Sequence, residues 1–136
     1  LRILQIAEGS GVHVSHFATR LASSTREKFL WYPTDCDPAS RASIAAYIQD
    51  EQLDQIGVQP PLPLTLDVNG IQESSTLAKV SAAPLDLILC INMIHISPWD
   101  ATLGLMKASG QLLGENGVLF CYGPYKEGGT AVASNL

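Results

Sequence analysis

The chain has 136 residues, of which 46% are hydrophobic and 15% charged, and its formal net charge is −5. This acidic balance argues against general nucleic-acid binding, which usually needs a basic face, and it leaves no polybasic patch for an anionic membrane. No apolar run reaches the roughly 18 residues that a transmembrane helix needs. We therefore expect neither nucleic acid nor membrane as a partner.

The first predicted strand covers residues 2–7, a short apolar run. It ends at Glu8-Gly9-Ser10-Gly11, where two glycines allow a tight turn. A helix should follow, because apolar residues then recur at the spacing i, i+3, i+4 and i+7, namely Val14, Phe17, Ala18 and Leu21.

The second predicted strand covers residues 28–32, and Pro33-Thr34-Asp35 should close it. Asp37 stands directly before Pro38, a pair that is typical of a helix N-cap followed by proline at the first helical position. This helix should bury one apolar stripe and end near Gly57.

The third predicted strand, residues 61–66, contains two prolines that suit an edge position. A short helix is expected over residues 75–80. Residues 85–91 form the strongest predicted strand, apolar on both faces, as a central parallel strand needs to be.

The last predicted helix begins with Ser97 as its cap and Pro98 at its first position, and it should run to about Leu113. A fifth strand is expected over residues 118–122. The remainder, residues 123–136, is rich in small residues and is expected to be loop.

This alternation of strands and helices predicts a single α/β domain over residues 1–136, built on a parallel sheet. In such sheets ligands bind beyond the carboxyl ends of the strands, where the strand order reverses. The candidate functional residues are therefore those that directly follow each strand.

The turn after the first strand could hold a ligand through its backbone amides, or it could be an ordinary structural turn. A dinucleotide fingerprint would place a third glycine at position 14, where this chain has Val14. That difference disfavours a nicotinamide oxidoreductase.

Acidic side chains follow the next two strands. Asp35 could accept both hydroxyls of a ribose, because Asp37 is the better placed helix cap. Asp67-Val68 could read the edge of an adenine, although an Asx turn before Asn69-Gly70 is nearly as plausible.

Asn92 ends the apolar fourth strand, where burying an amide is costly unless it is used. His95 can titrate near neutral pH and could act as a base, although a lone histidine is more often a structural residue. His13 and His16 lack companions at metal-ligand spacing, so we expect no metal site.

The three cysteines, Cys36, Cys90 and Cys121, form no CxxC pair, which indicates reduced thiols. The first residues also lack the features of a signal peptide. We therefore expect a cytoplasmic protein.

Residues 3–11, Ile-Leu-Gln-Ile-Ala-Glu-Gly-Ser-Gly, resemble the first motif of class I S-adenosylmethionine-dependent methyltransferases. Four segments together more closely resemble the methyltransferase-like protein 26 family, and the most specific is residues 89–99, Leu-Cys-Ile-Asn-Met-Ile-His-Ile-Ser-Pro-Trp. The others are residues 6–13 with 16–18, residues 31–38 and residues 64–68.

The resemblance implies a Rossmann-like, doubly wound sheet with strand order 3-2-1-4-5. The usual class I sheet continues into a C-terminal hairpin that this chain lacks, so the fifth strand would be an apolar edge, and a homodimer could cover it.

The resemblance also implies which residues hold S-adenosylmethionine. Glu8, Gly9, Ser10 and Gly11 would line its methionine and ribose part, and Asp35 would bind the ribose diol. Cys36 would flank the adenine, Asp67 and Val68 would read its edge, and Asn92 and Met93 would lie beside the methyl group. Gln5 departs from the motif, which usually carries an acid at that position.

The implied reaction is methyl transfer to a small-molecule or protein acceptor, mainly through positioning, with Asn92 and His95 as the catalytic candidates. The alternative is a methyltransferase-like binding or partner protein that holds S-adenosylmethionine or S-adenosylhomocysteine with little or no catalysis. Gln5 keeps this alternative open.

Overall fold

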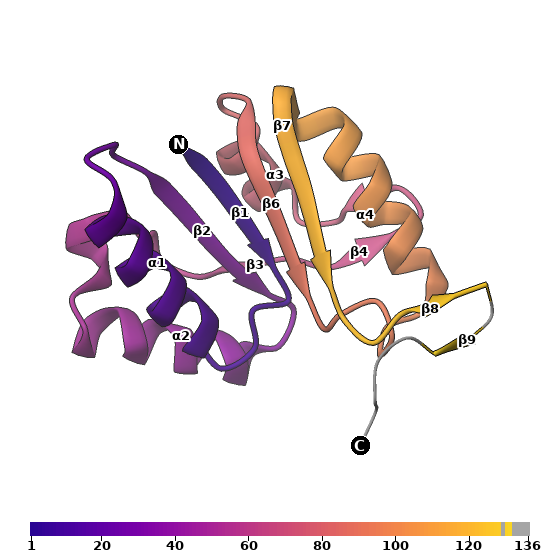
Figure 1. Cartoon of the computed structure of the whole chain (residues 1–136), viewed down its shortest axis with the longest axis horizontal. Helices are drawn as coiled ribbons and strands as arrows, with labels where there is room; N and C mark the ends of the chain where they lie inside the picture. The colour runs from indigo at the N-terminus through magenta and orange to yellow at the C-terminus, as the bar shows by residue number, and fades with distance from the viewer. Residues whose placement is uncertain (129, 132–136) are drawn as a thin grey trace.

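The computed structural model describes residues 1–128, 130 and 131, and its centre is a five-stranded parallel sheet with the strand order β3-β2-β1-β6-β7 (Figure 1). This order confirms the predicted sequence of strands, because β6 and β7 are the fourth and fifth predicted strands. The five strands are β1 (Arg2–Ile6), β2 (Leu30–Asp35), β3 (Leu62–Pro63), β6 (Leu85–Ile91) and β7 (Leu113–Tyr122).

Helices pack on both faces of this sheet (Figure 1). Side chains alternate along β1, so Ile3 packs with the first two helices, whereas Leu4 and Ile6 pack on the other side of the sheet. The helices are α1 (Val12–Ser24), α2 (Pro38–Asp50), α3 (Ser74–Val80) and α4 (Trp99–Leu112), with a 3₁₀ turn η1 (Leu53–Ile56) after α2.

Strand β2 continues through Pro33 to Asp35, beyond the predicted end at residue 32. On the β3 side, Trp31 exchanges backbone hydrogen bonds with Gly57 and Gln59, while pairing with β3 starts only at Thr34. Backbone groups of every second residue in a strand point to the same side, so the nitrogen of Pro33 points to the β3 side, as the backbone groups of Trp31 do. It lies between the Trp31 contacts and the start of the β3 pairing. The proline therefore removes no ladder bond.

The segment predicted as a third strand over residues 61–66 is divided between two sheets. Its first part forms the two-residue strand β3, and its end begins a separate hairpin of β4 (Leu66–Asp67) and β5 (Gly70–Ile71). Another small hairpin, β8 (Lys126–Glu127) and β9 (Thr130–Ala131), lies where a loop was predicted. The hairpin residues carry weak strand patterns, so neither was apparent from the sequence.

Two helix boundaries also differ from prediction. Helix α2 ends at Asp50, and Gly57 instead ends the 3₁₀ turn, with a φ of 114°. Helix α4 has Pro98 as its N-cap residue, one position later than predicted, and a proline side chain cannot accept a capping hydrogen bond. The Asp37 cap is confirmed, since its carboxylate accepts the N–H groups of Ala39 at 3.2 Å and Ser40 at 3.3 Å.

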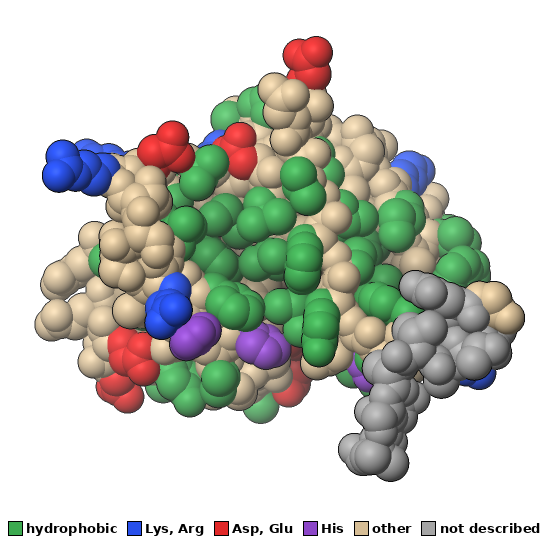
Figure 2. Space-filling view, in the orientation of Figure 1, with side chains coloured by type: hydrophobic (Ala, Val, Ile, Leu, Met, Phe, Trp, Pro, Cys, Tyr) green, Lys and Arg blue, Asp and Glu red, His purple; other side chains and the backbone are tan. Residues whose placement is uncertain are grey.

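One face of β6 and β7 is not covered by the described elements. Helices α1 and α2 pack beside β1 and β2, and a band of hydrophobic side chains continues past α1 over β6 and β7 (Figure 2). Phe17, predicted on the buried stripe of α1, is 38% exposed at the border of this band. On β7, which lies at the sheet edge, Val118 is 55% exposed and Phe120 49%.

Candidate functional site

A pocket of about 340 Å³ opens at the carboxyl ends of β1, β2 and β6. These strands meet where the strand order reverses, between β1 and β6, which is the position that α/β sheets use for ligands. The lining residues come from four places along the chain: Ile6, Ala7 and Gly9; Asp35 and Cys36; Leu64, Thr65 and Leu66; and Asn92, Met93, Ile96, Ser97, Pro98 and Ala101.

The turn after β1 contributes its backbone to this pocket. Gly9 has a φ of 80°, and a Cβ on it would meet no atom within 4 Å, so this glycine leaves open space for a ligand. Gly11 has a φ of 105°, and a Cβ there would lie 2.7 Å from Cδ2 of Tyr47 and 3.1 Å from Cα of Ile44. Gly11 therefore allows α1 and α2 to pack closely, and it lies outside the pocket lining.

Asp35 lies at the end of β2 and is 8% exposed. Its two carboxylate oxygens accept the backbone N–H groups of Gly9 and Asp37, each at 2.9 Å. A carboxylate offers about four acceptor positions, so positions remain for a ligand's hydroxyl groups. The Asp35 side chain is therefore held in place by the backbone and can still bind a ligand.

Asn92 and Met93 follow β6 and also line the pocket. Asn92 has a left-handed backbone with a φ of 58°, and its N–H donates to the carbonyl of Tyr122 at 2.8 Å. Asparagine tolerates this conformation better than most residues, and such strain often occurs at functional sites. Met93 is buried at the base of the pocket.

Asp67 and Val68 lie in the β4–β5 hairpin, outside the pocket lining. Asp67 forms an Asx turn, because its Oδ1 accepts the N–H of Asn69 at 2.7 Å. This was the alternative reading of the sequence. The residues just before the hairpin, Leu64, Thr65 and Leu66, line the pocket instead.

Three further predicted residues do not line the pocket. Ser10 is exposed, and its carbonyl accepts the hydroxyl of Ser43 at 2.5 Å. His95 is exposed on the segment after β6, and its role as a base stays a prediction. Glu8 is buried behind the glycine turn, with its Oε1 accepting the N–H of Val14 at 2.9 Å.

The sequence-based reasoning missed the contribution of α4. Ser97, Pro98 and Ala101 form a wall at the beginning of this helix, whereas the sequence pattern indicates only a capping role for the first two. The signal was present, because a helix that follows a strand end must begin beside the pocket. Together with Leu64 and Leu66, this wall gives the pocket an apolar side that could hold a flat ring.

Gln5 has a structural role in this fold. It is 1% exposed, and its Oε1 accepts the indole N–H of Trp31 at 3.0 Å. The hydroxyl of Thr34 donates to the Gln5 carbonyl at 2.7 Å. The neutral amide is therefore used to join β1 to β2 beneath the site.

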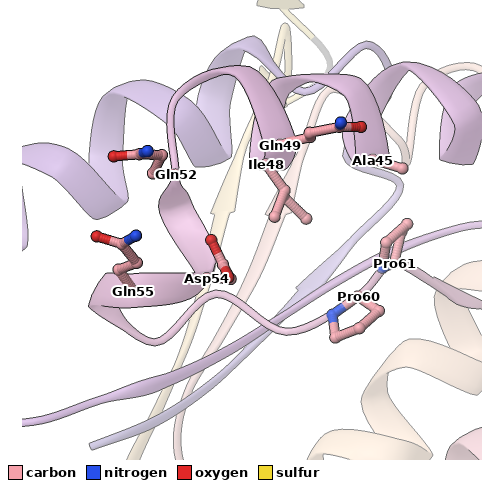
Figure 3. Close-up of a pocket in the computed structure, with 8 residues that line it drawn as sticks. All are labelled: Ala45, Ile48, Gln49, Gln52, Asp54, Gln55, Pro60 and Pro61. Atoms are coloured by element: carbon pink, nitrogen blue, oxygen red, sulfur yellow. The ribbon is translucent and has the colours of Figure 1, made fainter.

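A second hollow, of about 450 Å³, lies between α2, η1 and Pro60-Pro61, the residues just before the edge strand β3 (Figure 3). Its rim carries the amides of Gln49, Gln52 and Gln55 together with Asp54 (Figure 3). None of the predicted site residues lines it, so the pocket at the carboxyl ends is the better candidate.

Within residues 1–128, 130 and 131, no group of three His, Cys, Asp or Glu side chains is arranged to hold a metal ion. Among the helices that the structure describes, none has the length and apolar character needed to cross a membrane.

Several solved methyltransferase structures share this fold. The DszA carbon methyltransferase superposes with a TM-score of 0.62 at 23% identity, over 89% of this chain and 28% of its own. PKMT2 from Rickettsia typhi, in complex with AdoHcy, gives a TM-score of 0.59 at 17% identity, over 87% of this chain and 19% of its own. A proposed rRNA-methylase from Clostridium thermocellum gives 0.58 at 16% identity, over 87% of this chain and 60% of its own.

The chain thus has the Rossmann-like α/β fold of these methyltransferases, and it spans less than two thirds of their length. The family described as Protein of unknown function (DUF938) matches residues 1–136, and the chain belongs to that family.

Proposed function

We propose that this chain forms the cofactor-binding part of an S-adenosylmethionine-dependent methyltransferase. The observation that carries the proposal is the meeting of the Gly9 turn, Asp35 and Asn92 on one pocket at the point where the strand order reverses. The fold shared with methyltransferases supports it, and so does the neighbour crystallised with AdoHcy.

The residues present fit such a cofactor. Asp35 has free acceptor positions for the two ribose hydroxyls, and the Gly9 turn leaves space for a close backbone approach. The apolar side formed by Leu64, Leu66 and Pro98 suits the adenine ring, with Cys36 beside it. When bound, the cofactor supplies a methyl group on a sulfonium, which is the reactive part of the chemistry.

The contribution of the protein would be mainly positioning and exclusion of water. Asn92 and Met93 would lie beside the reacting end, where the amide of Asn92 can orient an acceptor. His95 could take a proton from an oxygen or nitrogen nucleophile if an acceptor brought it toward the pocket. Substitution of His95 by Gln should then lower turnover of the acceptor without changing cofactor affinity.

The finer parts of the proposal follow from the sequence resemblance. They are membership of the methyltransferase-like protein 26 group, a small-molecule or protein acceptor, a cytoplasmic location, and a homodimer through the edge at β7. Sedimentation at several protein concentrations tests the homodimer, and a single monomeric species throughout would contradict it.

The alternative function is a methyltransferase-like binding or partner protein with little or no catalysis. The observation that favours it is Gln5, because this neutral side chain is buried and its oxygen is already bonded to Trp31. A screen of acceptors with labelled methyl donor separates the two functions, since only the first transfers label.

The test of cofactor binding is calorimetric titration with S-adenosylhomocysteine and, separately, NADH. We expect binding of S-adenosylhomocysteine and none of NADH. Asp35→Ala should weaken binding by about ten-fold or more, since it removes acceptors for charged hydrogen bonds of about 1.5–3 kcal/mol. Asp54→Asn, in the second hollow, is the control and should bind as wild type. Equal affinity in the Asp35 variant would contradict the proposed site.

A further inference from the structure

Glu8 is an acidic residue in an unusually buried position. It directly precedes Gly9 in the turn, yet its side chain is 4% exposed and does not line the pocket. Acidic side chains are rarely this buried without partners. Its placement therefore needs a specific reason.

The partners of Glu8 are the backbone amides that begin α1. Its Oε1 accepts the N–H of Val14 at 2.9 Å, and the N–H groups of Gly11 and His13 lie nearby. Helix α1 has no side-chain cap at Gly11 and no acidic residue in its first turn. Since the first N–H groups of a helix need acceptors, Glu8 supplies the cap from the preceding turn.

This contact closes the backbone from residue 8 to residue 14 into a ring that contains the whole glycine turn. The N–H of Glu8 itself donates to the Thr34 carbonyl at 3.0 Å, and the next N–H, that of Gly9, donates to Asp35. Glu8 is thus held at both its backbone and its side chain, between β2 and α1.

The second carboxylate oxygen, Oε2, is buried and has no hydrogen-bond partner within the described residues. An oxygen left in this way costs free energy, so helix capping alone would be served better by a short, exposed side chain. Gln5, where the resembled motif carries an acid, is neutral and bonded to Trp31. Glu8 is consequently the buried acid of this turn.

We propose that Glu8 is a positioning residue that fixes the glycine turn, so that Gly9 keeps its contact with Asp35 and leaves the ribose side of the pocket open. The ligand in this inference rests on the proposed function, while the ordering of the turn does not.

The test compares Glu8→Ala, Glu8→Gln and Glu8→Asp with Glu27→Gln, an exposed acid that serves as the matched control. Two quantities are measured well below the unfolding temperature: affinity for S-adenosylhomocysteine, and hydrogen exchange of the amides of residues 9–14. Glu8→Ala should speed exchange at Val14 and weaken affinity by up to about ten-fold, because the loosened turn must then be ordered again when the ligand binds. Glu8→Gln should keep most of the wild-type affinity and most of the exchange protection, because its amide oxygen can still accept from the N–H of Val14.

Glu8→Asp, one methylene shorter, should behave like Glu8→Ala and serves if the alanine variant does not fold. Wild-type affinity in Glu8→Ala or Glu8→Asp, with only a lower unfolding temperature, would overturn the positioning role. If the wild-type protein binds no S-adenosylhomocysteine, the proposed function fails, but hydrogen exchange still tests whether Glu8 orders the turn. Exchange at Val14 that is as slow in Glu8→Ala as in wild type would contradict that ordering role.

Discussion

The carboxylate of Asp35 accepts the backbone N–H of Gly9 at 2.9 Å, which ties the end of β2 to the turn after β1. This single bond joins the two sequence features that are most typical of nucleoside-binding α/β folds, the glycine turn and the acid after the second strand. Together with the Glu8–Val14 contact, it holds a turn that contains three left-handed residues, Ala7, Gly9 and Gly11.

Replacing Gly11 by Ala should destabilise the protein by about 2 kcal/mol or more, because the added Cβ needs an unfavourable φ and collides with Tyr47 and Ile44. Gly9→Ala has the unfavourable φ but open space, so it should cost about 1 kcal/mol. At Gly110, in helix α4, an added Cβ would meet no atom within 4 Å outside the helix's own backbone, so Gly110→Ala should stabilise the protein by about 0.5–1 kcal/mol. Urea unfolding of the three variants measures this order, and equal losses at positions 9 and 11 would contradict the packing argument.

Stability should fall as the pH rises above the ordinary pKa of a glutamate, because burial raises the pKa of Glu8 from 4.5. The folded protein then holds a proton that the unfolded chain has already released, so deprotonation through the folded pKa favours unfolding. In Glu8→Gln this part of the pH dependence should be absent. Unfolding temperatures measured at several pH values above 4.5, with Glu27→Gln as control, test the direction of this dependence. An identical change of unfolding temperature with pH in wild type and Glu8→Gln would contradict it.

The three cysteines should react with a thiol reagent at different rates. Cys36 is exposed in the pocket, so it should react first, and bound S-adenosylhomocysteine should slow it. Cys90 is buried beside Cys121, and this raises the pKa of its thiol to about 12, so little reactive thiolate forms at neutral pH. Mass spectrometry of the labelled protein over time tests the order, and early labelling of Cys90 would show that β6 is more open than described.

Replacing Gln5 by Glu tests whether the site tolerates an acid at the usual motif position. The new carboxylate can still accept from Trp31, but its second oxygen would be buried in the core, so we expect a loss of about 1–3 kcal/mol. Urea unfolding measures this loss, and calorimetry shows whether affinity for S-adenosylhomocysteine changes. A variant as stable as wild type would show that a carboxylate fits beside Trp31 without penalty.

The elements that could be predicted are those whose cause is local or repeated along the chain. The apolar run of β6, the stripe of α1 and the Asp37-Pro38 cap carry their own signals, and the rule for parallel sheets then placed Asp35 and Asn92 at one edge. These parts of the fold and site followed from residue type and spacing.

The predictions that were wrong concern residues whose positions depend on contacts between segments far apart in the sequence. The carbonyl of Asp67 packs where a Cβ on Gly104 would lie, 1.9 Å away, so the β4–β5 hairpin fits against α4 only through this glycine. Nothing near Asp67 in the sequence signals that contact. The same holds for the exposure of Phe17, which depends on how far α1 extends over the neighbouring strands.

The most direct test of the central claim is to map the backbone amide shifts of the labelled protein during titration with S-adenosylhomocysteine. We expect saturable changes at Gly9, Cys36 and Asn92, with little change at Gln52 and Gln55 in the second hollow. An absence of saturable changes, or changes centred on Gln52 and Gln55, would contradict a cofactor site at the carboxyl ends of the strands.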